Sequence, residues 1–371
     1  MAFTRLIAIT CAALATAQVA YAAAATTANR GHKCPTGQTT ANAACCALFP
    51  IIDTLQQELF DGNECGEEAH SALRLSFHDA IGFSIHGQGG GADGSILAFN
   101  KTETAFHANN GIDDITDSQW PIFLKSGLSA GDFVHLAAAV GITNCPGAPS
   151  LQYFYGRPPP RAPAPDLTVP EPTDSVTKIL QRFADAGFDA AEVIALLSSH
   201  TIAAADKVDP TIPGTPFDST VGTFDSQVFL EVLLKGTIIP GNGTVLQPGE
   251  VLSPIHGEMR LQSDFALSQD PRTACLWQEM INNQKRMVTE FAAAMAKMQV
   301  LGQNKAKLID CSDVIPKSAP FTTAIKYPAT FSRAQVQQAC HILPFPNLAT
   351  VAGPAPTLPP VYVNTSSFVL S

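Results

Sequence analysis

Two histidine-centred segments, far apart in the chain, carry the residue types that could do chemistry. The first, LRLSFHD at 73–79, places Arg74 and His78 four residues apart, so they share one face if the segment is a helix. A cation and a potential base on one face suit proton transfer on a small polar molecule. The second, LLSSHT at 196–201, places His200 in an apolar stretch, as an axial ligand to a buried metal would be.

Either segment alone is a weak signal, since a lone histidine on an apolar stretch is more often a satisfied core residue. Together, with Asp79 after the first histidine and Thr201 after the second, they indicate a haem pocket. One side of it would carry the catalytic residues, and the other side would bind the iron. His78 would take a proton from a bound peroxide and return it to the departing oxygen. Arg74 would stabilise the charge that develops as the O–O bond breaks, and Phe77 would wall the pocket.

Two further residues are candidates to orient the histidines. Asn109 is the candidate acceptor for the second ring nitrogen of His78, although it could equally cap a turn. Asp264 is the candidate carboxylate on the second nitrogen of His200, although it could be a surface acid in a turn.

Two loops rich in oxygen donors accompany the histidines. Asp79, the Gly91 carbonyl, Asp93 and Ser95 are hard ligands of the kind that calcium prefers, and GGGADGS at 89–95 can wrap closely around an ion. A phosphate-binding loop is disfavoured because no strand precedes it and no helix lysine follows. The segment 218–225 (DSTVGTFD) again alternates acids and hydroxyls. Either loop alone could be a solvated acidic turn, but two loops joined to pocket histidines favour structural calcium ions.

The composition and the N-terminus suggest a secreted globular chain. The 371 residues are 46% hydrophobic, enough for a large domain or two lobes, and the net charge of −10 disfavours a nucleic-acid partner. Arg5, the apolar run at 6–15 and small residues up to Ala25 predict a signal peptide over 1–25, too short in its apolar part for a membrane anchor. Three sites could carry glycans and begin at Asn100, Asn242 and Asn364.

The cysteines predict a disulfide framework. Of nine cysteines, Cys11 would leave with the signal peptide, and the remaining eight imply four disulfides in a secreted protein. No CxxC spacing occurs, which disfavours a metal site. The sequence alone leaves 105 pairings open. Adjacent Cys45 and Cys46 point in different directions and are expected to bond to different partners.

Helical periodicity dominates the chain, and we expect a mainly α fold with little β structure. Gly- and Pro-rich stretches separate the helices, and 156–172 is typical of an ordered connector between two lobes. We expect a domain over 26–343, with lobes at about 26–172 and 173–343, and an extended Pro-rich tail over 344–371. The predicted helices span 43–59, 67–80, 132–140, 174–186, 189–204, 224–235 and 272–300.

At these residues the chain resembles the secreted class II fungal haem peroxidases, which comprise lignin, manganese, versatile and generic low-potential enzymes. The resemblance covers nearly all of the mature chain and adds NCPGAP at 144–149, FDST at 217–220 and DCSDV at 310–314 to the segments above. It implies a mostly helical fold with b-type haem between two lobes and one calcium ion on each side.

The resemblance also implies individual roles. Arg74, Phe77, His78 and Asn109 would be distal to the haem, and His200, Phe217 and Asp264 proximal. The first calcium ion would bind Asp79, Gly91, Asp93 and Ser95, and the second Thr201, Asp218, Thr220, Thr223 and Asp225. The disulfides would be Cys34–Cys46, Cys45–Cys311, Cys65–Cys145 and Cys275–Cys340.

In the peroxidases that this chain resembles, two surface sites determine which reductant the enzyme oxidises. Lignin and versatile peroxidases carry a surface tryptophan five residues before the proximal histidine, where this chain has Ala195. Typical manganese peroxidases hold Mn(II) with two glutamates and an aspartate, and here the matching residues are Glu67, Ser71 and Asp206. Two carboxylates and a haem propionate still offer three anionic oxygens. The arginine that often flanks this site is replaced by Ala204.

We therefore expect an extracellular, monomeric haem peroxidase that uses hydrogen peroxide to oxidise Mn(II), small phenols or dyes, in lignin or aromatic breakdown. The alternatives are a generic peroxidase without Mn(II) oxidation, on which Glu67 and Asp206 are ordinary surface acids, and a non-enzymatic secreted calcium-binding protein. A hydrolase using Ser198 or Ser199 with His200 fails because neighbours on a helix point apart and no nucleophile elbow is present.

Overall fold

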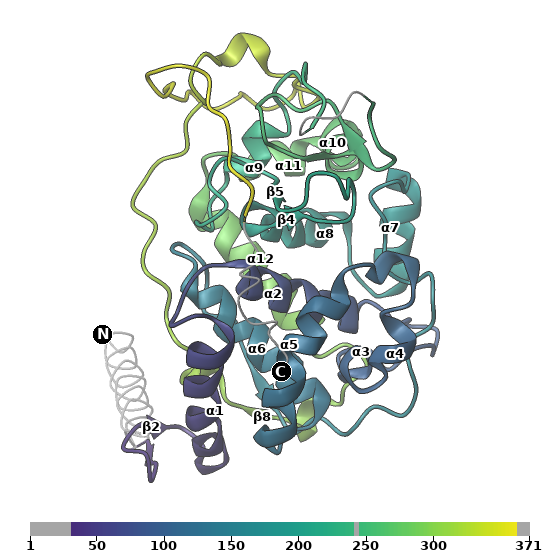
Figure 1. Cartoon of the computed structure of the whole chain (residues 1–371), viewed down its shortest axis with the longest axis vertical. Coiled ribbons are helices and arrows are strands. Elements are labelled where there is room, and N and C mark those ends of the chain that lie inside the picture. Colours follow the sequence, from purple (N-terminus) through teal and green to yellow (C-terminus); the bar gives the residue numbers. More distant parts are fainter. Residues whose placement is uncertain (1–30, 241–244, 362–371) are drawn as a thin grey trace, which may run out of the picture.

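The computed structural model describes residues 31–240 and 245–361 (Figure 1). The predicted signal peptide, the glycan sites Asn242 and Asn364 and the last ten residues of the tail lie outside the described residues. Within them the predicted mainly helical class is confirmed. The α-helices are α1 (Phe49–Thr54), α2 (Glu67–Ala80), α3 (Ser95–Ala98), α4 (Asn100–Glu103), α5 (Ile112–Ser126), α6 (Ala130–Gly141), α7 (Val176–Asp185), α8 (Ala190–Leu196), α9 (Gln227–Glu231), α10 (Gln262–Gln269), α11 (Ala274–Met280) and α12 (Gln284–Met298).

Short helical turns extend or link these helices. The π-helical turn η2 (Leu55–Leu59) continues α1, so that 43–59 is helical throughout as predicted. The others are 3₁₀ turns: η1 (Ala43–Leu48), η3 (His107–Asn109), η4 (Ile142–Asn144), η5 (Leu197–Ile202), η6 (Lys305–Lys307), η7 (Ser312–Val314) and η8 (Arg333–Gln335).

One predicted helix is wrong. The segment 272–300 forms two helices, α11 and α12, because the chain turns between them. Asn282 has a left-handed φ of 55°, which a helix interior does not tolerate, and the side chain of Asn283 caps the start of α12. The helix predicted over 189–204 ends at Ile202, and the helix predicted over 224–235 is shorter, at Gln227–Glu231.

The β structure is small, as expected. Each strand has two residues, and the strands form four antiparallel pairs. The pairs are β1 (His32–Lys33) with β2 (Thr39–Thr40), β3 (Phe154–Tyr155) with β8 (Ile309–Asp310), β4 (Ala204–Ala205) with β5 (Thr215–Pro216), and β6 (Glu250–Val251) with β7 (Arg260–Leu261).

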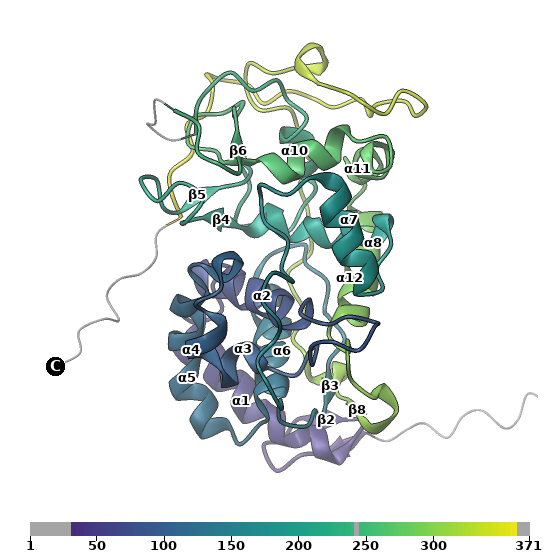
Figure 2. The ribbon, with the colours of Figure 1, turned by 90° about the vertical axis from the view of Figure 1, so that its right-hand side faces the viewer.

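The helices gather in two parts that meet at the middle of the molecule. Figures 1 and 2 show α1 to α6 in the lower part and α7 to α11 in the upper part, with α2 at the top of the lower group. The buried α6 packs against α2, and α12 packs against α8. Phe291, Met295 and Met298 of α12 are buried in the core, as their helical spacing predicts. His78 thus lies on α2 in the lower part, and His200 lies on η5, which continues α8 of the upper part.

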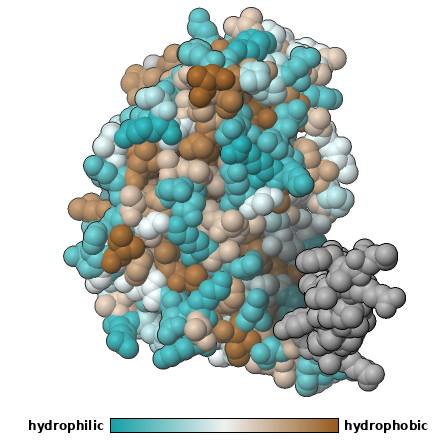
Figure 3. Space-filling model, turned by 180° about the vertical axis from the view of Figure 1, so that it is seen from behind, coloured by the Kyte–Doolittle hydropathy of each residue, from teal (hydrophilic) through white to brown (hydrophobic). Residues whose placement is uncertain are grey.

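Disulfides and a tail tie distant segments together. All four disulfides pair as the resemblance implies, and Cys45 and Cys46 bond to different partners. Residues 344–361 contain no helix and contact the upper part. There Thr357 forms an isolated β-bridge with His256, and the Val361 amide donates to the Gly214 carbonyl. None of the described helices has the length and apolarity that crossing a membrane requires. The face in Figure 3 intersperses hydrophobic and hydrophilic residues.

Candidate active site

His78 lies on α2, where its imidazole is buried and oriented. Two acids in the first turn of α2 suit the positive end of its dipole, and the helix runs unbroken to Ala80. Nδ1 of His78 lies 2.8 Å from Oδ1 of Asn109, whose Nδ2 donates to the Glu103 carbonyl at 2.9 Å. Burial, aided by the charge of Arg74, lowers the pKa of His78 to about 3. A neutral imidazole with Nδ1–H donating leaves Nε2 as a free base.

Arg74 lies one turn before His78, on the same face of α2. Arg74 is exposed as a residue, and its Nη2 donates to the Asn110 carbonyl at 3.2 Å. Phe77 is half-buried, with its ring 5.6 Å from that of His78 and edge-on to it. The structure thus brings Arg74, Phe77, His78 and Asn109 together at one place.

The second histidine is held by a carboxylate. A capping box of Asp189 and Glu192 starts α8, and η5 extends that helix to His200. Nδ1 of His200 lies 2.6 Å from Oδ2 of Asp264, and the ring of Phe217 lies 5.3 Å from the imidazole. Asp264 is in the first turn of α10 and is buried, so it is no surface acid.

This arrangement fits a histidine that would hold haem iron. Asp264 occupies Nδ1, which leaves Nε2 as the nitrogen able to bind a metal. The His200 side chain is 24% exposed although Asp264 is only 2% exposed, so packing does not close that edge of the imidazole. The donor set therefore suits the haem implied by the resemblance.

The oxygen donors beside His78 also converge. Asp79 is fully buried, and its Oδ2 accepts from the Gly94 amide at 2.9 Å and lies 3.1 Å from Nε2 of His135. Its Oδ1 has no hydrogen-bond partner among the described residues. Burial raises the pKa of Asp93 to about 7, and the charge of Asp79 adds to the shift. An orphaned buried carboxylate oxygen beside a second carboxylate fits a hard cation.

The donors after His200 meet in the same way. Thr201 Oγ1 donates to Asp218 at 2.5 Å and lies 3.4 Å from Oδ1 of Asp225. Thr220 Oγ1 lies 3.1 Å from both carboxylates, and the Thr223 amide donates to the Thr220 carbonyl. Burial raises the pKa of Asp218, with the charge of Asp225 as the next cause. Two buried carboxylates facing two hydroxyls fit the second calcium site.

Glu67, Ser71 and Asp206 form a half-buried polar cluster near Arg74. Ser71 Oγ donates to Oε1 of Glu67 at 2.8 Å, one turn apart on α2. Asp206 follows β4 and accepts from the Gly214 amide at 2.7 Å. Burial raises the pKa of Glu67 to about 7, and the charge of Asp206 is the next cause, so Asp206 lies close enough to disfavour a charge on Glu67.

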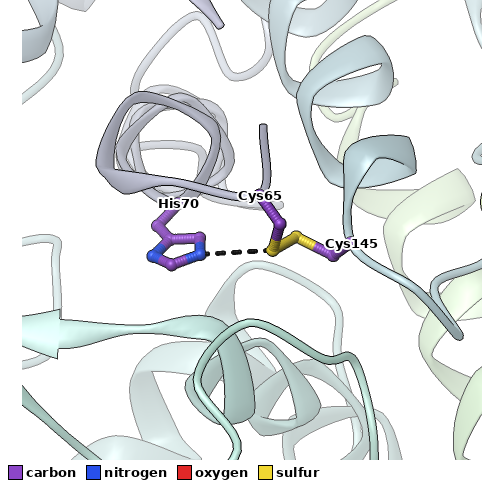
Figure 4. Close-up of side chains that lie close together, drawn as sticks. All are labelled: Cys65, His70 and Cys145. Carbon is purple, nitrogen blue, oxygen red and sulfur yellow. Dashed lines mark hydrogen bonds between the residues drawn. A yellow bond between two sulfur atoms is a disulfide. The ribbon is translucent and has the colours of Figure 1, made fainter. Parts of the chain in front are cut away.

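A second cluster of metal-type ligands has another explanation. Atoms of Cys65, His70 and Cys145 lie within 4.8 Å of one another, but the two sulfurs are bonded to each other as a disulfide (Figure 4). His70 Nε2 lies 3.5 Å from the Cys65 sulfur. The cluster fastens the first turn of α2 and is no metal site in this form.

Sequence reasoning missed two residues that support the site. His135 of α6 contacts Asp79 from 56 positions away. Glu103 is buried, accepts the Ala164 amide at 2.9 Å through Oε1 and holds Asn109 through its carbonyl. No local pattern announces the His135–Asp79 contact or the Glu103–Ala164 contact, because each joins segments that meet only in the folded chain.

Comparison with known proteins agrees with this geometry. A family model described as "Peroxidase" matches residues 51–283, and a "Fungal peroxidase extension region" matches 286–362. Versatile peroxidase VPS1 of Pleurotus eryngii is 54% identical over 97% of this chain and 99% of its own length. Manganese peroxidase 3 of Phlebia radiata is 53% identical over 88% of this chain and 92% of its own length. Ligninase H2 of Phanerodontia chrysosporium is 48% identical over 96% of this chain and 96% of its own length. This chain therefore belongs to the fungal class II peroxidase family.

Proposed function

We propose that this peroxidase uses hydrogen peroxide to oxidise Mn(II) to Mn(III), and small phenols and dyes by one-electron steps. In this proposal it acts outside the cell as a monomer, in the breakdown of lignin or other aromatic material. The observation that carries the manganese part is the cluster of Glu67 and Ser71 on α2 with Asp206 nearby, whose charge helps to raise the pKa of Glu67. Relatives named as manganese and versatile peroxidases support it.

The haem, when bound, supplies the redox chemistry by which peroxide is reduced by two electrons and the reductants give up one electron each. His200 would hold its iron through Nε2, and the Asp264 carboxylate would make the imidazole a stronger donor. Phe217 would pack beside that ligand.

On the distal side the proton is moved by His78. Because Nδ1 is engaged by Asn109, Nε2 accepts the proton from peroxide and returns it to the departing oxygen. The guanidinium of Arg74, one turn away on α2, stabilises the negative charge that develops on that oxygen. Phe77 walls the site beside His78 and limits it to small oxidants.

Two calcium ions would fix these groups from outside the pocket. The first would bind the donors that begin with Asp79, directly after His78, and the second those that begin with Thr201, directly after His200. Each ion would therefore hold the backbone next to a working histidine. Buried carboxylates without counter-charge are costly, which supports a cation at each position.

For Mn(II) as substrate, the carboxylates of Glu67 and Asp206 and the hydroxyl of Ser71 offer hard oxygens. A generic peroxidase without Mn(II) oxidation is the second candidate, and the replacement of a carboxylate by Ser71 favours it. The non-enzymatic alternative no longer holds, because the chain belongs to a family of peroxidases.

The deciding experiment is a Mn(II) titration of the haem-loaded enzyme with peroxide, in which Mn(III) is followed as its malonate complex. We expect saturable turnover that is lost in Asp206→Ala while dye oxidation survives. Asp53→Ala, which removes an exposed carboxylate from α1, is the matched control. Dye oxidation without Mn(II) turnover in the wild type would make the protein a generic peroxidase.

A further inference from the structure

Leu167 combines two features that a leucine normally avoids. Its backbone is left-handed, with φ of 64°, and its side chain is 79% exposed. The left-handed region brings Cβ too close to the following carbonyl, so glycine or asparagine is the usual occupant. Strained residues of this kind persist where the surroundings enforce them and cluster at functional sites.

Leu167 lies at a cavity that reaches the distal histidine. The lining of this cavity includes His78, Asn109, Phe106, Leu167 and Val169, together with the acids Glu103 and Asp166. Its volume of about 10 Å³ is that of one water-sized molecule, so it is too small for an aromatic ring. Because most of the Leu167 side chain is exposed while His78 is buried, Leu167 stands at the outer rim and His78 at the inner end.

The turn that presents Leu167 is fastened on both sides. The Ala164 amide donates to the buried Glu103 carboxylate at 2.9 Å, and the Leu167 amide donates to Oδ1 of Asp166 at 2.7 Å. Thr168 Oγ1 donates to the Pro165 carbonyl at 2.8 Å. These contacts hold the leucine side chain outward at the rim, at the expense of backbone strain and exposed apolar surface.

We infer that Leu167 is a specificity-determining contact for small aromatic reductants, which dock at the mouth of this cavity with a ring against its side chain. The inference rests on the part of the proposed function that assigns phenols and dyes as reductants. Peroxide is small and polar and has no need of an apolar contact there, and Mn(II) has no apolar surface to bury. Covering about half of a leucine side chain is worth roughly tenfold in affinity.

The test uses Leu167→Gly and Leu167→Asn in the haem-loaded enzyme, since both residues tolerate a left-handed backbone. With guaiacol as the reductant we expect KM to rise about 5- to 10-fold at unchanged kcat. The dissociation constant of guaiacol, from absorbance titration without peroxide, should rise by the same factor. The thermal midpoint should not fall, since glycine relieves the strain.

Leu124→Ala is the matched control, because it removes a leucine that is 65% exposed on α5 and does not line the cavity. An unchanged guaiacol KM and dissociation constant in both Leu167 variants would overturn the inference. So would an equal loss in the peroxide rate constant, because Leu167 would then act through the turn's contact with Glu103. If the wild type failed to oxidise guaiacol, the proposed function would fail, and the titration would still decide the contact.

Discussion

The Ser71 hydroxyl donates a 2.8 Å hydrogen bond to the Glu67 carboxylate, one helical turn away on α2. By resemblance to manganese peroxidases, a second glutamate would stand where this serine is. Because a hydroxyl carries no charge, the cluster of Glu67, Ser71 and Asp206 has one negative charge fewer than a site with two glutamates and an aspartate. Under the proposed function, the preference for Mn(II) as reductant would therefore depend on position 71.

Ser71→Glu is expected to lower KM for Mn(II) by about tenfold or more, because a third carboxylate binds a hard dication more tightly. Guaiacol and dye kinetics should not change. Steady-state Mn(III)–malonate formation measures the effect, and Ser71→Gln, similar in size but uncharged, is the control. Equal KM values in the two variants would show that Mn(II) is not bound at this cluster.

His78→Ala is expected to slow the reaction with peroxide by about 10²- to 10⁴-fold, because it removes the proton acceptor. His86→Ala, an exposed histidine in the loop after α2, is the control. Because burial lowers the pKa of His78 to about 3, the wild-type rate constant should stay level from neutral pH to about pH 4 and fall below it. Stopped-flow absorbance measures both effects, and near-wild-type rates in His78→Ala would refute the assignment.

Asp264→Asn is expected to slow the peroxide reaction by about 10- to 100-fold, because the amide is a weaker acceptor for the His200 Nδ1–H. A less electron-rich imidazole should also shift the Fe(III)/Fe(II) potential upward. The Soret absorbance controls for haem content. An unchanged potential in fully loaded protein would mean that Asp264 only packs against His200.

The helix that carries the distal residues was predictable because apolar residues recur along it at helical spacing. The period of apolar residues predicted α2 to the residue, and the Arg74–His78 spacing follows from that helix. The contacts of His135 with Asp79 and of Glu103 with Ala164 were not predictable, because each joins segments that are distant in the sequence. The break at Asn282 was missed because asparagine also occurs within helices, so the residue type alone does not predict its left-handed φ of 55°. The strain at Leu167 likewise has no sequence signal.

Removal of the two proposed calcium ions is expected to lower the thermal midpoint by about 5–10 °C, because the buried carboxylates would lose their counter-charge. Asp79 and Asp218 are both fully buried, so neither can be solvated in place. Unfolding is measured by circular dichroism with and without EGTA, and magnesium addition is the control for ionic strength. A midpoint that EGTA does not move, in protein whose calcium content is shown to fall, would contradict a structural role.

Glu258 provides a test of pH dependence through a buried carboxyl that takes no part in the proposed mechanism. It is fully buried, and neither carboxylate oxygen has a hydrogen-bond partner among the described residues. Burial raises its pKa well above the ordinary 4.5, and the charge of Glu231 adds to the shift while that of Arg260 opposes it. Below pH 4.5 folded and unfolded chains both hold the proton. Above it the unfolded chain releases the proton while the folded chain retains it, so this group costs stability as the pH rises.

Glu258→Gln, which keeps the shape of the protonated acid and cannot titrate, should therefore match the wild type near pH 4 and become progressively more stable at higher pH. Urea unfolding at pH 4, 6 and 8 measures the difference in unfolding free energy, and Glu58→Gln, an exposed glutamate in η2, is the control. A difference that does not change with pH would mean that Glu258 titrates alike in both states. A variant that becomes less stable as the pH rises would mean that the ionised carboxylate is stabilised by Arg260 in the folded protein.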